Sequence, residues 1–335
     1  MLNIGVIGCG AIGRDHIRRL TDIVPGCQVV ACADYFEEAV IKVAAQYEGM
    51  KAYKTGEELI AAPEVQAVVI TSSDPSHAGY VLEALKAGKQ VFCEKPLAQS
   101  AADCEKIIAA ETAHGKRLVQ VGFMRHYDRG YAEMKRIIDS GELGAPLMIH
   151  ACHRNVSQPD GFQTEMGVSN VAIHELDICR WLLGDEYKSG QVLKVRQSAC
   201  STKGYDNPQI VLLETQSGAR IDVEVQVADA YGYDIQCQVV CEKGTVNLPD
   251  PYAVVKRSNA TRSFPILTDW KDRFIEAYDI ELTHWVKTLE EKGEPDGPSA
   301  WDGYAACVAA DTLNRSRGTN QFLPIEMMDK PALYK

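Results

Sequence analysis

The chain has 335 residues, 46% of them hydrophobic and 24% charged, which is typical of a globular protein with about two domains. Its net charge is −11 and no block of lysine and arginine stands out, which argues against nucleic acid or an anionic membrane as a partner. No apolar run approaches the ~18–20 residues of a membrane helix, and a strand pattern begins at once in place of a basic leader, so we expect no secretory signal.

A glycine-rich turn follows the first apolar strand. Ile4–Ile7 leads directly into the run Gly8-Cys9-Gly10-Ala11-Ile12-Gly13, and a helical pattern opens after it. A strand, then G-x-G-x-x-G, then a helix is the context of the dinucleotide-binding fingerprint, whereas the same turn alone is a weak signal. The glycines permit a tight turn, a close approach to the pyrophosphate and close helix packing. We therefore expect a dinucleotide to contact Gly8, Gly10, Ala11, Ile12 and Gly13.

An acidic residue ends the second predicted strand. Val29–Ala33 is followed by Asp34, which lies 21 residues after Gly13. A carboxylate at this spacing accepts hydrogen bonds from the adenosine ribose and repels a 2′-phosphate. The sequence therefore favours NAD over NADP as the cofactor.

The strand–helix alternation then continues. It predicts an α/β fold with a parallel, doubly wound sheet. The further strands are Ala67–Thr71, Gln90–Cys93 and Leu118–Val121, with helices near residues 36–46, 76–87, 100–114 and 128–140.

Polar side chains follow three of these strands. In doubly wound sheets ligands bind beyond the carboxyl ends of the strands, so at the first two of these ends we expect cofactor contacts from Thr71, Ser72, Ser73, His77, Glu94 and Lys95. Lys95 could be an ordinary surface charge, but its place at the predicted crevice favours a functional role. The residues at the three ends are Thr71-Ser72-Ser73 with His77 nearby, Glu94-Lys95-Pro96, and Arg125-His126-Tyr127.

The pattern changes after Gly144-Ala145-Pro146. Short strands punctuated by glycines predict a mostly antiparallel meander, and two amphipathic helices follow it, near Lys271–Glu291 and Ala300–Arg317. We divide the chain into an NAD-binding domain over residues 1–124 and a substrate-binding and oligomerisation domain over residues 125–335. The predicted strands are Leu147–His153, Gln191–Ser198, Gln209–Thr215, Ala219–Val227, Tyr233–Cys241, Thr245–Leu248 and Tyr252–Lys256.

The stretch from Met166 to Gly184 predicts a helix that ends at its glycine. Asn170, His174 and Asp177 are spaced to share one helical face. A polar, titratable face on an otherwise apolar helix is costly unless something meets it. A catalytic histidine and a buried histidine with satisfied partners explain this pattern about equally well.

Three motifs occur in order along the chain: the glycine-rich turn, Glu94-Lys95-Pro96, and His174-Glu175-Leu176-Asp177. With them the whole chain resembles the glucose–fructose oxidoreductase / inositol dehydrogenase (Gfo/Idh/MocA) family. Each motif is short, but their order and spacing together are specific. Segments similar to the inositol dehydrogenase branch of that family are Val119–Arg125, His153–Asn155, Tyr231–Gln236 and Ala300–Tyr304.

The resemblance implies a Rossmann domain followed by an α/β domain with a large open sheet, which has helices on one face and neighbouring subunits of a homotetramer on the other. It implies NAD-dependent oxidation of myo-inositol, or of a close stereoisomer, to the 2-keto compound. In this reaction Lys95 holds the reacting hydroxyl and His174 is the base, which agrees with the ordinary pKa of histidine. The residues implied to bind the polyol are Arg125, His153, Asn155, Asp177, Tyr233 and Tyr278.

The chain departs from the family at Asn170, which we count with the catalytic residues. Inositol dehydrogenases usually have aspartate four residues before the catalytic histidine, and an amide cannot stabilise an imidazolium by charge. The departure leaves open another inositol stereoisomer, another polyol or a pyranose sugar as substrate. A non-catalytic NAD- and polyol-binding sensor is a further alternative, although the retention of Lys95 and His174 argues against it.

The cysteines point to the reducing environment of the cytoplasm. All eleven are scattered, without a Cys-x-x-Cys pair, and many lie inside apolar runs. They predict buried thiols and neither a disulfide framework nor a zinc site. We therefore expect no metal, and a zinc-dependent alcohol dehydrogenase is disfavoured because a ligand cluster is lacking.

Overall fold

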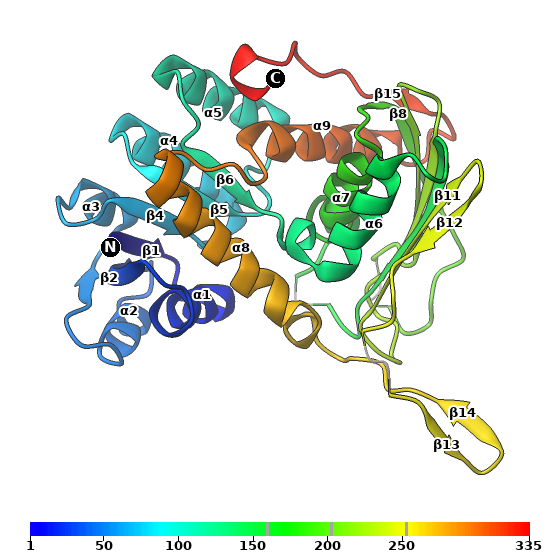
Figure 1. Ribbon diagram of the computed structural model, residues 1–335, viewed down its shortest axis with the longest axis horizontal. Coiled ribbons are helices and arrows are strands. Elements are labelled where there is room, and N and C mark those ends of the chain that lie inside the picture. Colours follow the sequence, from blue (N-terminus) through cyan, green and yellow to red (C-terminus); the bar gives the residue numbers. More distant parts are fainter. Residues whose placement is uncertain (159–160, 202–203, 252–253) are drawn as a thin grey trace. The chain divides into compact units, whose positions relative to one another are not determined.

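The computed structural model describes residues 1–158, 161–201, 204–251 and 254–335. It divides into two compact units (Figure 1). Unit 1 contains Met1–Met124, Tyr278–Cys307 and Met328–Lys335, and unit 2 contains Arg125–Ala277 and Val308–Met327. The last two helices, α8 (Trp270–Lys292) and α9 (Ala300–Ser316), therefore contribute residues to both units.

Unit 1 contains a six-stranded parallel sheet in the order β3-β2-β1-β4-β5-β6. This is the doubly wound order in which the chain reverses direction at β1, so the predicted fold class of the first half is confirmed. The strands are β1 (Leu2–Ile7), β2 (Cys27–Ala33), β3 (Lys51–Tyr53), β4 (Ala67–Ile70), β5 (Gln90–Glu94) and β6 (Val119–Gly122). The helices between them are α1 (Ala11–Asp22), α2 (Glu37–Ala44), α3 (Gly56–Ala61), α4 (Asp74–Lys86) and α5 (Ala101–His114).

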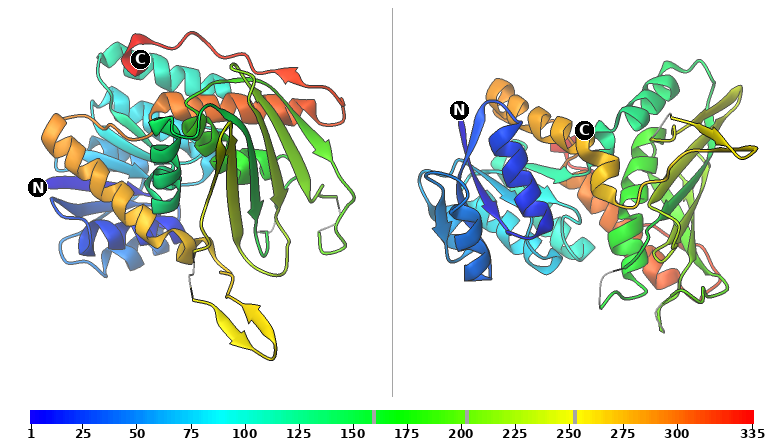
Figure 2. Two further views of the ribbon diagram at one scale, coloured as in Figure 1. Left: turned by 45° about the vertical axis from the view of Figure 1, so that its right-hand side comes forward. Right: turned by 90° about the horizontal axis from the view of Figure 1, so that it is seen from below.

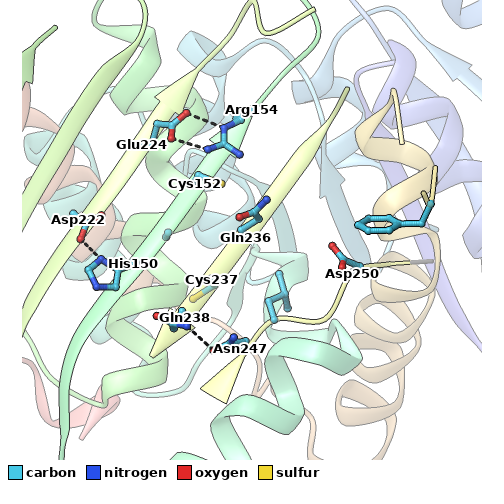
Figure 3. Close-up of a pocket in the computed structure, with 13 residues that line it drawn as sticks. His150, Cys152, Arg154, Asp222, Glu224, Gln236, Cys237, Gln238, Asn247 and Asp250 are labelled. Atoms are coloured by element: carbon cyan, nitrogen blue, oxygen red, sulfur yellow. Dashed lines mark hydrogen bonds and ion pairs between the residues drawn. The ribbon is translucent and has the colours of Figure 1, made fainter. Parts of the chain in front are cut away.

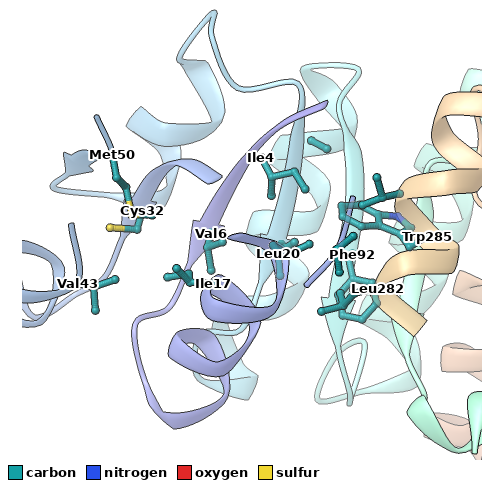
Figure 4. Close-up of a cluster of buried hydrophobic side chains, with 14 of the residues drawn as sticks. Ile4, Val6, Ile17, Leu20, Cys32, Val43, Met50, Phe92, Leu282 and Trp285 are labelled. Atoms are coloured by element: carbon teal, nitrogen blue, oxygen red, sulfur yellow. The ribbon is translucent and has the colours of Figure 1, made fainter. Parts of the chain in front are cut away.

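An apolar core fixes these elements to one another. Side chains of β1, α1 and β5 pack against the part of α8 that belongs to unit 1 (Figure 4). Trp285 is fully buried, and its ring meets Phe92 edge-on at a centroid distance of 5.5 Å. Because the strands are buried on both faces, they appear in the sequence as continuous apolar runs, and this is why the prediction found them.

Unit 2 contains a seven-stranded mixed sheet in the order β12-β11-β7-β10-β9-β8-β15. Only the pair β7 and β10 is parallel, so the predicted mostly antiparallel sheet is confirmed. The strands are β7 (Pro146–Arg154), β8 (Tyr187–Lys194), β9 (Gln209–Thr215), β10 (Arg220–Gln226), β11 (Asp234–Cys241), β12 (Gly244–Asn247) and β15 (Leu323–Pro324). The helical segments are η1 (Met124–Tyr127), α6 (Arg129–Ser140), the π-helical η2 (Gly167–Ala172) and α7 (Ile173–Leu183).

The two faces of this sheet differ in polarity. Alternate residues such as Val211, Val223 and Val239 are fully buried on one face. The other face carries ion pairs between neighbouring strands, and a cavity of about 620 Å³ opens there (Figure 3). His153 of β7 alternates with the cavity residue Arg154, so the two side chains lie on opposite faces.

The structure differs from the predicted strands at several points. The strand expected over Gln191–Ser198 is β8, which ends at Lys194 because its partner β9 begins only at Gln209. Of the strand expected over Tyr252–Lys256, the first two residues lie outside the described ranges, and Lys256 begins β13. β13 (Lys256–Ser258) and β14 (Thr261–Ser263) form a separate hairpin. The short elements β3, α3 and β15 were not predicted, because two to six residues carry little periodicity. Across the described ranges, no helix is long and apolar enough to cross a membrane.

Candidate active site

The glycine-rich turn after β1 has the geometry that close approach to a dinucleotide requires. Gly8 has φ +104°, and an added Cβ there would lie 2.5 Å from the backbone of Thr71. At Gly13 a Cβ would lie 1.9 Å from the carbonyl oxygen of Gly8. At Gly10 nothing of the protein lies within 4 Å of that position, so the backbone is open there. Two glycines are thus required by packing, and the third leaves space for a ligand.

The N-terminus of α1 supplies charge that favours an anion at this open position. Gly10 caps the helix without a side-chain hydrogen bond, and the first turn contains no acidic residue. The helix dipole and the first backbone N–H groups are therefore available to a phosphate. The residues present fit the pyrophosphate of a dinucleotide.

Asp34 lies against the same turn. It follows β2, and its Oδ2 accepts a hydrogen bond of 2.5 Å from the backbone N–H of Cys9. Its Oδ1 accepts a second bond of 2.9 Å from the N–H of Phe36. These bonds hold the carboxylate beside the glycine-rich turn, at the place expected for ribose recognition.

The three residues expected after β4 differ in their side-chain contacts. Thr71 is buried, and its hydroxyl is 3.1 Å from the carbonyl oxygen of Ile7 and 2.8 Å from that of Gly8. The Ser72 hydroxyl lies 2.7 Å from that of Ser76, and Ser73 caps α4 without a side-chain bond. Thr71 thus stabilises the glycine-rich turn through the carbonyl oxygen of Gly8.

His77 connects the ends of two neighbouring strands. Its Nδ1 lies 2.7 Å from the carbonyl oxygen of Pro96, and its Nε2 lies 3.0 Å from that of Ser72. The side chain is only 1% exposed. The expected cofactor residue therefore holds the turn that follows Lys95 against the end of β4.

Lys95 is partly exposed and follows a buried carboxylate. Oε1 of Glu94 lies 2.8 Å from Nε2 of His16, and Glu94 accepts a bond of 3.2 Å from the backbone N–H of Lys95.

The ring of Tyr278 packs against His16 at 5.6 Å and beneath the guanidinium of Arg19 at 5.3 Å. Packing against α1 is thus the observed environment of Tyr278 in unit 1.

The helix that carries His174 begins with a π-helical turn. Gly167–Ala172 is π-helical, α7 follows over Ile173–Leu183, and Gly184 ends it at φ 61°. Hydrogen bonds in a π-helix run from residue i to i+5. The face shared by Asn170, His174 and Asp177 was expected from α-helical spacing. That spacing applies to His174 and Asp177, which both lie on α7, but Asn170 lies in the π-helical turn before it. The Asn170 Oδ1 accepts a bond of 3.0 Å from the Ser169 hydroxyl.

Asp177 contacts a histidine that was not among the predicted site residues. Its Oδ2 lies 2.7 Å from Nε2 of His126, which is on η1. The His126 ring stacks on Trp181 at a centroid distance of 4.5 Å. The sequence signal available was only the position of His126 directly after Arg125 at a strand end.

Arg125, His153 and Glu175 form a buried cluster in unit 2. Arg125 and Glu175 make an ion pair, and both side chains are 1% exposed. His153 Nδ1 lies 2.9 Å from Glu175 Oε2 and 3.2 Å from Arg125 Nη2. The Arg125 guanidinium also lies over the rings of Phe274, at 5.6 Å, and Tyr131, at 5.9 Å. Glu175 was visible in the motif His174–Asp177, but the sequence assigned it no role.

Tyr233 and His174 adjoin this cluster through His153. The Tyr233 ring meets His153 edge-on at 5.8 Å, and burial raises its pKa to about 12. His153 and His174 have ring centroids 6.2 Å apart. The Asn155 Oδ1 is buried and has no hydrogen-bond partner among the residues that the structure describes, which suits an acceptor for a ligand hydroxyl.

Neither a metal-binding cluster nor a disulfide occurs in the described ranges. There, no group of three or more His, Cys, Asp or Glu side chains is arranged to hold a metal ion. All eleven cysteines lie in these ranges as free thiols, and all but Cys27 and Cys200 are buried.

Comparison with known proteins identifies the family. The model of an oxidoreductase family with an NAD-binding Rossmann fold (GFO/IDH/MocA) matches residues 2–123, and that of the GFO/IDH/MocA C-terminal domain matches residues 131–247. The chain belongs to the GFO/IDH/MocA oxidoreductase family. The resemblance stated from its motifs, and the NAD-binding Rossmann fold that it implied, are confirmed.

Individual relatives match over the full length. The chain is 53% identical to an inositol 2-dehydrogenase of Ralstonia nicotianae and 52% identical to one of Burkholderia cenocepacia, over 100% of this chain and 99% of each relative. It also superimposes on the crystal structure of myo-inositol dehydrogenase from Lactobacillus casei in complex with NAD(H) and myo-inositol. The TM-score is 0.96 at 37% identity, and both chains are covered completely.

The two glycines of the turn give a matched test of cofactor binding. Gly13→Ala places a Cβ against backbone, so we expect a lower Tm together with loss of NADH binding. Gly10→Ala meets no protein atom, so its Tm should stay at the wild-type value while NADH affinity falls at least about tenfold. Thermal unfolding and NADH fluorescence titration measure both effects. Wild-type NADH affinity in Gly10→Ala would show that the dinucleotide does not approach this position.

Proposed function

We propose that this protein is an NAD-dependent inositol 2-dehydrogenase, which oxidises myo-inositol or a close stereoisomer to the 2-keto compound. The observation that carries the proposal is full-length identity of 52–53% to inositol 2-dehydrogenases, together with the likeness to an L. casei enzyme crystallised with NAD(H) and myo-inositol. The chain also contains the glycine-rich turn, Lys95 and His174, which the family resemblance connects with this reaction.

The proposed chemistry assigns one task to each catalytic side chain. NAD, when bound at the glycine-rich turn, supplies the hydride acceptor. The Nζ of Lys95 donates hydrogen bonds to the reacting hydroxyl oxygen and so stabilises the negative charge that develops on it. The imidazole of His174 accepts the hydroxyl proton, a task that fits the ordinary pKa of histidine.

We assign polyol recognition to Asn155, His153, Asp177 and Tyr233. A polyol offers several hydroxyls, each of which can donate and accept, and the buried Asn155 Oδ1 provides an acceptor with no partner among the described residues. Arg125 has a different environment: it is 1% exposed and engaged with Glu175, so we assign it to support of the pocket. Tyr278 remains a proposed substrate residue whose described contacts are packing contacts with α1.

Asn170 bears on the choice of substrate. It stands where the resemblance leads us to expect aspartate, and it provides an amide in the π-helical turn before His174. This difference is why another inositol stereoisomer, another polyol or a pyranose remains the alternative to myo-inositol. A non-catalytic sensor is the alternative of a different class, and turnover decides between them.

The proposed reaction is tested by a substrate panel. We expect NADH formation with myo-inositol to exceed that with other inositol isomers and with aldoses.

The role of Lys95 is tested by substitution. Lys95→Ala should lower kcat at least about 100-fold and still bind NADH, because the lysine acts on the hydroxyl. Lys86→Ala, an exposed lysine on α4, is the control and should keep full activity. No turnover of any polyol would favour the sensor, and near-normal kcat in Lys95→Ala would remove the lysine from the mechanism.

We propose that Asp34 sets the preference for NAD. In the variant Asp34→Ser with Tyr35→Arg, the repulsive carboxylate is removed and a phosphate partner is added. The ratio of kcat/KM for NADP to that for NAD should rise at least about tenfold, and Asp34→Ser alone should show the smaller part of the change. Steady-state kinetics with both cofactors measure it. A wild-type enzyme that already prefers NADP would contradict this role of Asp34.

We propose further that the protein is a homotetramer of the cytoplasm, and that residues 125–335 carry its contacts. The free cysteines suit a reducing compartment. The hairpin of β13 and β14 extends beyond the sheet of unit 2 (Figures 1 and 2), and all six of its strand residues are exposed. A lone two-stranded hairpin is marginal in water, so contact with a neighbour would stabilise it. Its cations Lys256, Arg257 and Arg262 complement a chain with net charge −11.

Charge reversal on this hairpin tests the proposed assembly. The triple variant Lys256→Glu, Arg257→Glu, Arg262→Glu should sediment as smaller species than wild type, because attraction to the acidic neighbour becomes repulsion. Sedimentation velocity at two salt concentrations measures the effect. The control reverses three exposed lysines of unit 1 and should sediment as wild type does: Lys42→Glu, Lys54→Glu, Lys86→Glu. Unchanged sedimentation of the hairpin variant would exclude the hairpin from the interface.

A further inference from the structure

We propose that Glu175 is a positioning residue for the oxidation: it holds His153 with a proton on Nδ1, so that Nε2 of the neutral ring is left as an acceptor for a polyol hydroxyl. The part of the inference that concerns catalysis rests on the proposed function. Its structural half, the control of His153 by Glu175, stands on contacts within unit 2 alone.

The first step is the charge state of Glu175. Burial alone raises the pKa of this carboxyl, but the charge of Arg125 and the hydrogen bonds from Arg125 and His153 outweigh burial and lower the pKa to about 2. Glu175 is therefore an anion at any working pH. As a carboxylate it can only accept hydrogen bonds.

The second step is the position of the histidine proton. The His153 Nδ1 lies 2.9 Å from Glu175 Oε2 and 3.2 Å from Arg125 Nη2. The guanidinium only donates, so Nδ1 can satisfy one neighbour, as donor to Glu175 or as acceptor from Arg125. The shorter contact is the one to the carboxylate, and a charged acceptor makes the stronger bond. The proton therefore belongs on Nδ1, as it does where a carboxylate fixes the tautomer of a metal-binding histidine.

The third step is the link to the proposed base. The ring centroids of His153 and His174 are 6.2 Å apart, so the charge of the cluster acts on His174. Arg125 is one buried positive charge, and Glu175 cancels it. On the same helix as His174, Asp177 is paired with His126. The other titratable groups that interact with the cluster are Tyr131, Cys179, Tyr233 and Cys237, and burial raises the pKa of each. They are neutral at working pH, so Glu175 is the described group that balances Arg125.

The informative variant is Glu175→Gln, which keeps the shape of the side chain and removes its charge. A net positive charge then remains near His174 and disfavours its protonated form, so the pKa of His174 falls. The base works when deprotonated, so the acid limb of the pH profile of kcat/KM should move to lower pH by roughly one unit. At the plateau kcat/KM for the polyol should fall about 100-fold, because His153 is no longer held in its productive tautomer. NADH affinity should stay unchanged.

Two further variants separate positioning from general stability. Glu175→Asp keeps the charge but is shorter, so its acid limb should stay at the wild-type pH while kcat/KM falls. Glu186→Gln breaks the Arg180–Glu186 pair next to the same helix, whose two bonds are 2.6 and 2.7 Å long. It should lower Tm without moving the pH profile. If Glu175→Gln also only lowers Tm, with a superimposable profile, Glu175 is structural and the proposal is overturned.

A spectroscopic measurement makes the test independent of the substrate. In ¹⁵N-histidine-labelled protein, the signals of His153 are identified by their loss in His153→Asn. We expect a protonated Nδ1 in wild type and a shift of the proton toward Nε2 in Glu175→Gln. An unprotonated Nδ1 in wild type overturns the proposal even if inositol is oxidised. If Nδ1 of His153 is protonated but inositol is not oxidised, the result counts against the proposed function only. The pH profile is then measured with whichever polyol the enzyme does oxidise.

Discussion

The buried ion pair between Arg125 and Glu175 is the interaction on which the candidate active site of unit 2 depends. Both side chains are 1% exposed, and leaving either charge alone at that depth is strongly destabilising. The pair joins η1 to α7, and the bond from His153 adds β7. His174 directly precedes Glu175 on α7, so the contact that neutralises Arg125 also fixes the segment that carries the proposed base.

The cofactor end of unit 1 is built differently, from backbone in close contact. Gly8 and Gly13 exist as glycines because a Cβ at either position would overlap backbone atoms. The hydroxyl of Thr71 and the ring nitrogens of His77 lie within hydrogen-bond distance of backbone carbonyl oxygens at the turn and the strand ends. The positive end of α1 and the Asp34 carboxylate are then presented without a cluster of charged side chains. Such a site suits a ligand that needs a shaped surface and helix N–H groups.

The sequence predicted elements well where periodicity is strong. The buried parallel strands of unit 1 appear as apolar runs and the helices as helical patterns between them, so both the parallel, doubly wound fold class and the cofactor class followed. It could not place β7, which lies between β11 and β10 although β8 and β9 come next in the chain. The sequence could not predict the strand register either. β8 ends where its partner β9 begins, and that end depends on how the two strands pair.

In the candidate site, the sequence by itself determined the residue types and the elements that carry them: the glycine-rich turn before α1, Asp34 after β2, Lys95 after β5, and His174 with Asp177 on one helix. Only the tertiary structure decided which side chains meet. Asp177 bonds to His126, 51 residues away, Arg125 pairs with Glu175, 50 residues away, and His153 lies against Glu175, 22 residues away. The physical reason is range: local periodicity is written in neighbouring residues, whereas these contacts depend on the order of strands in a sheet and on the packing of α7 against it.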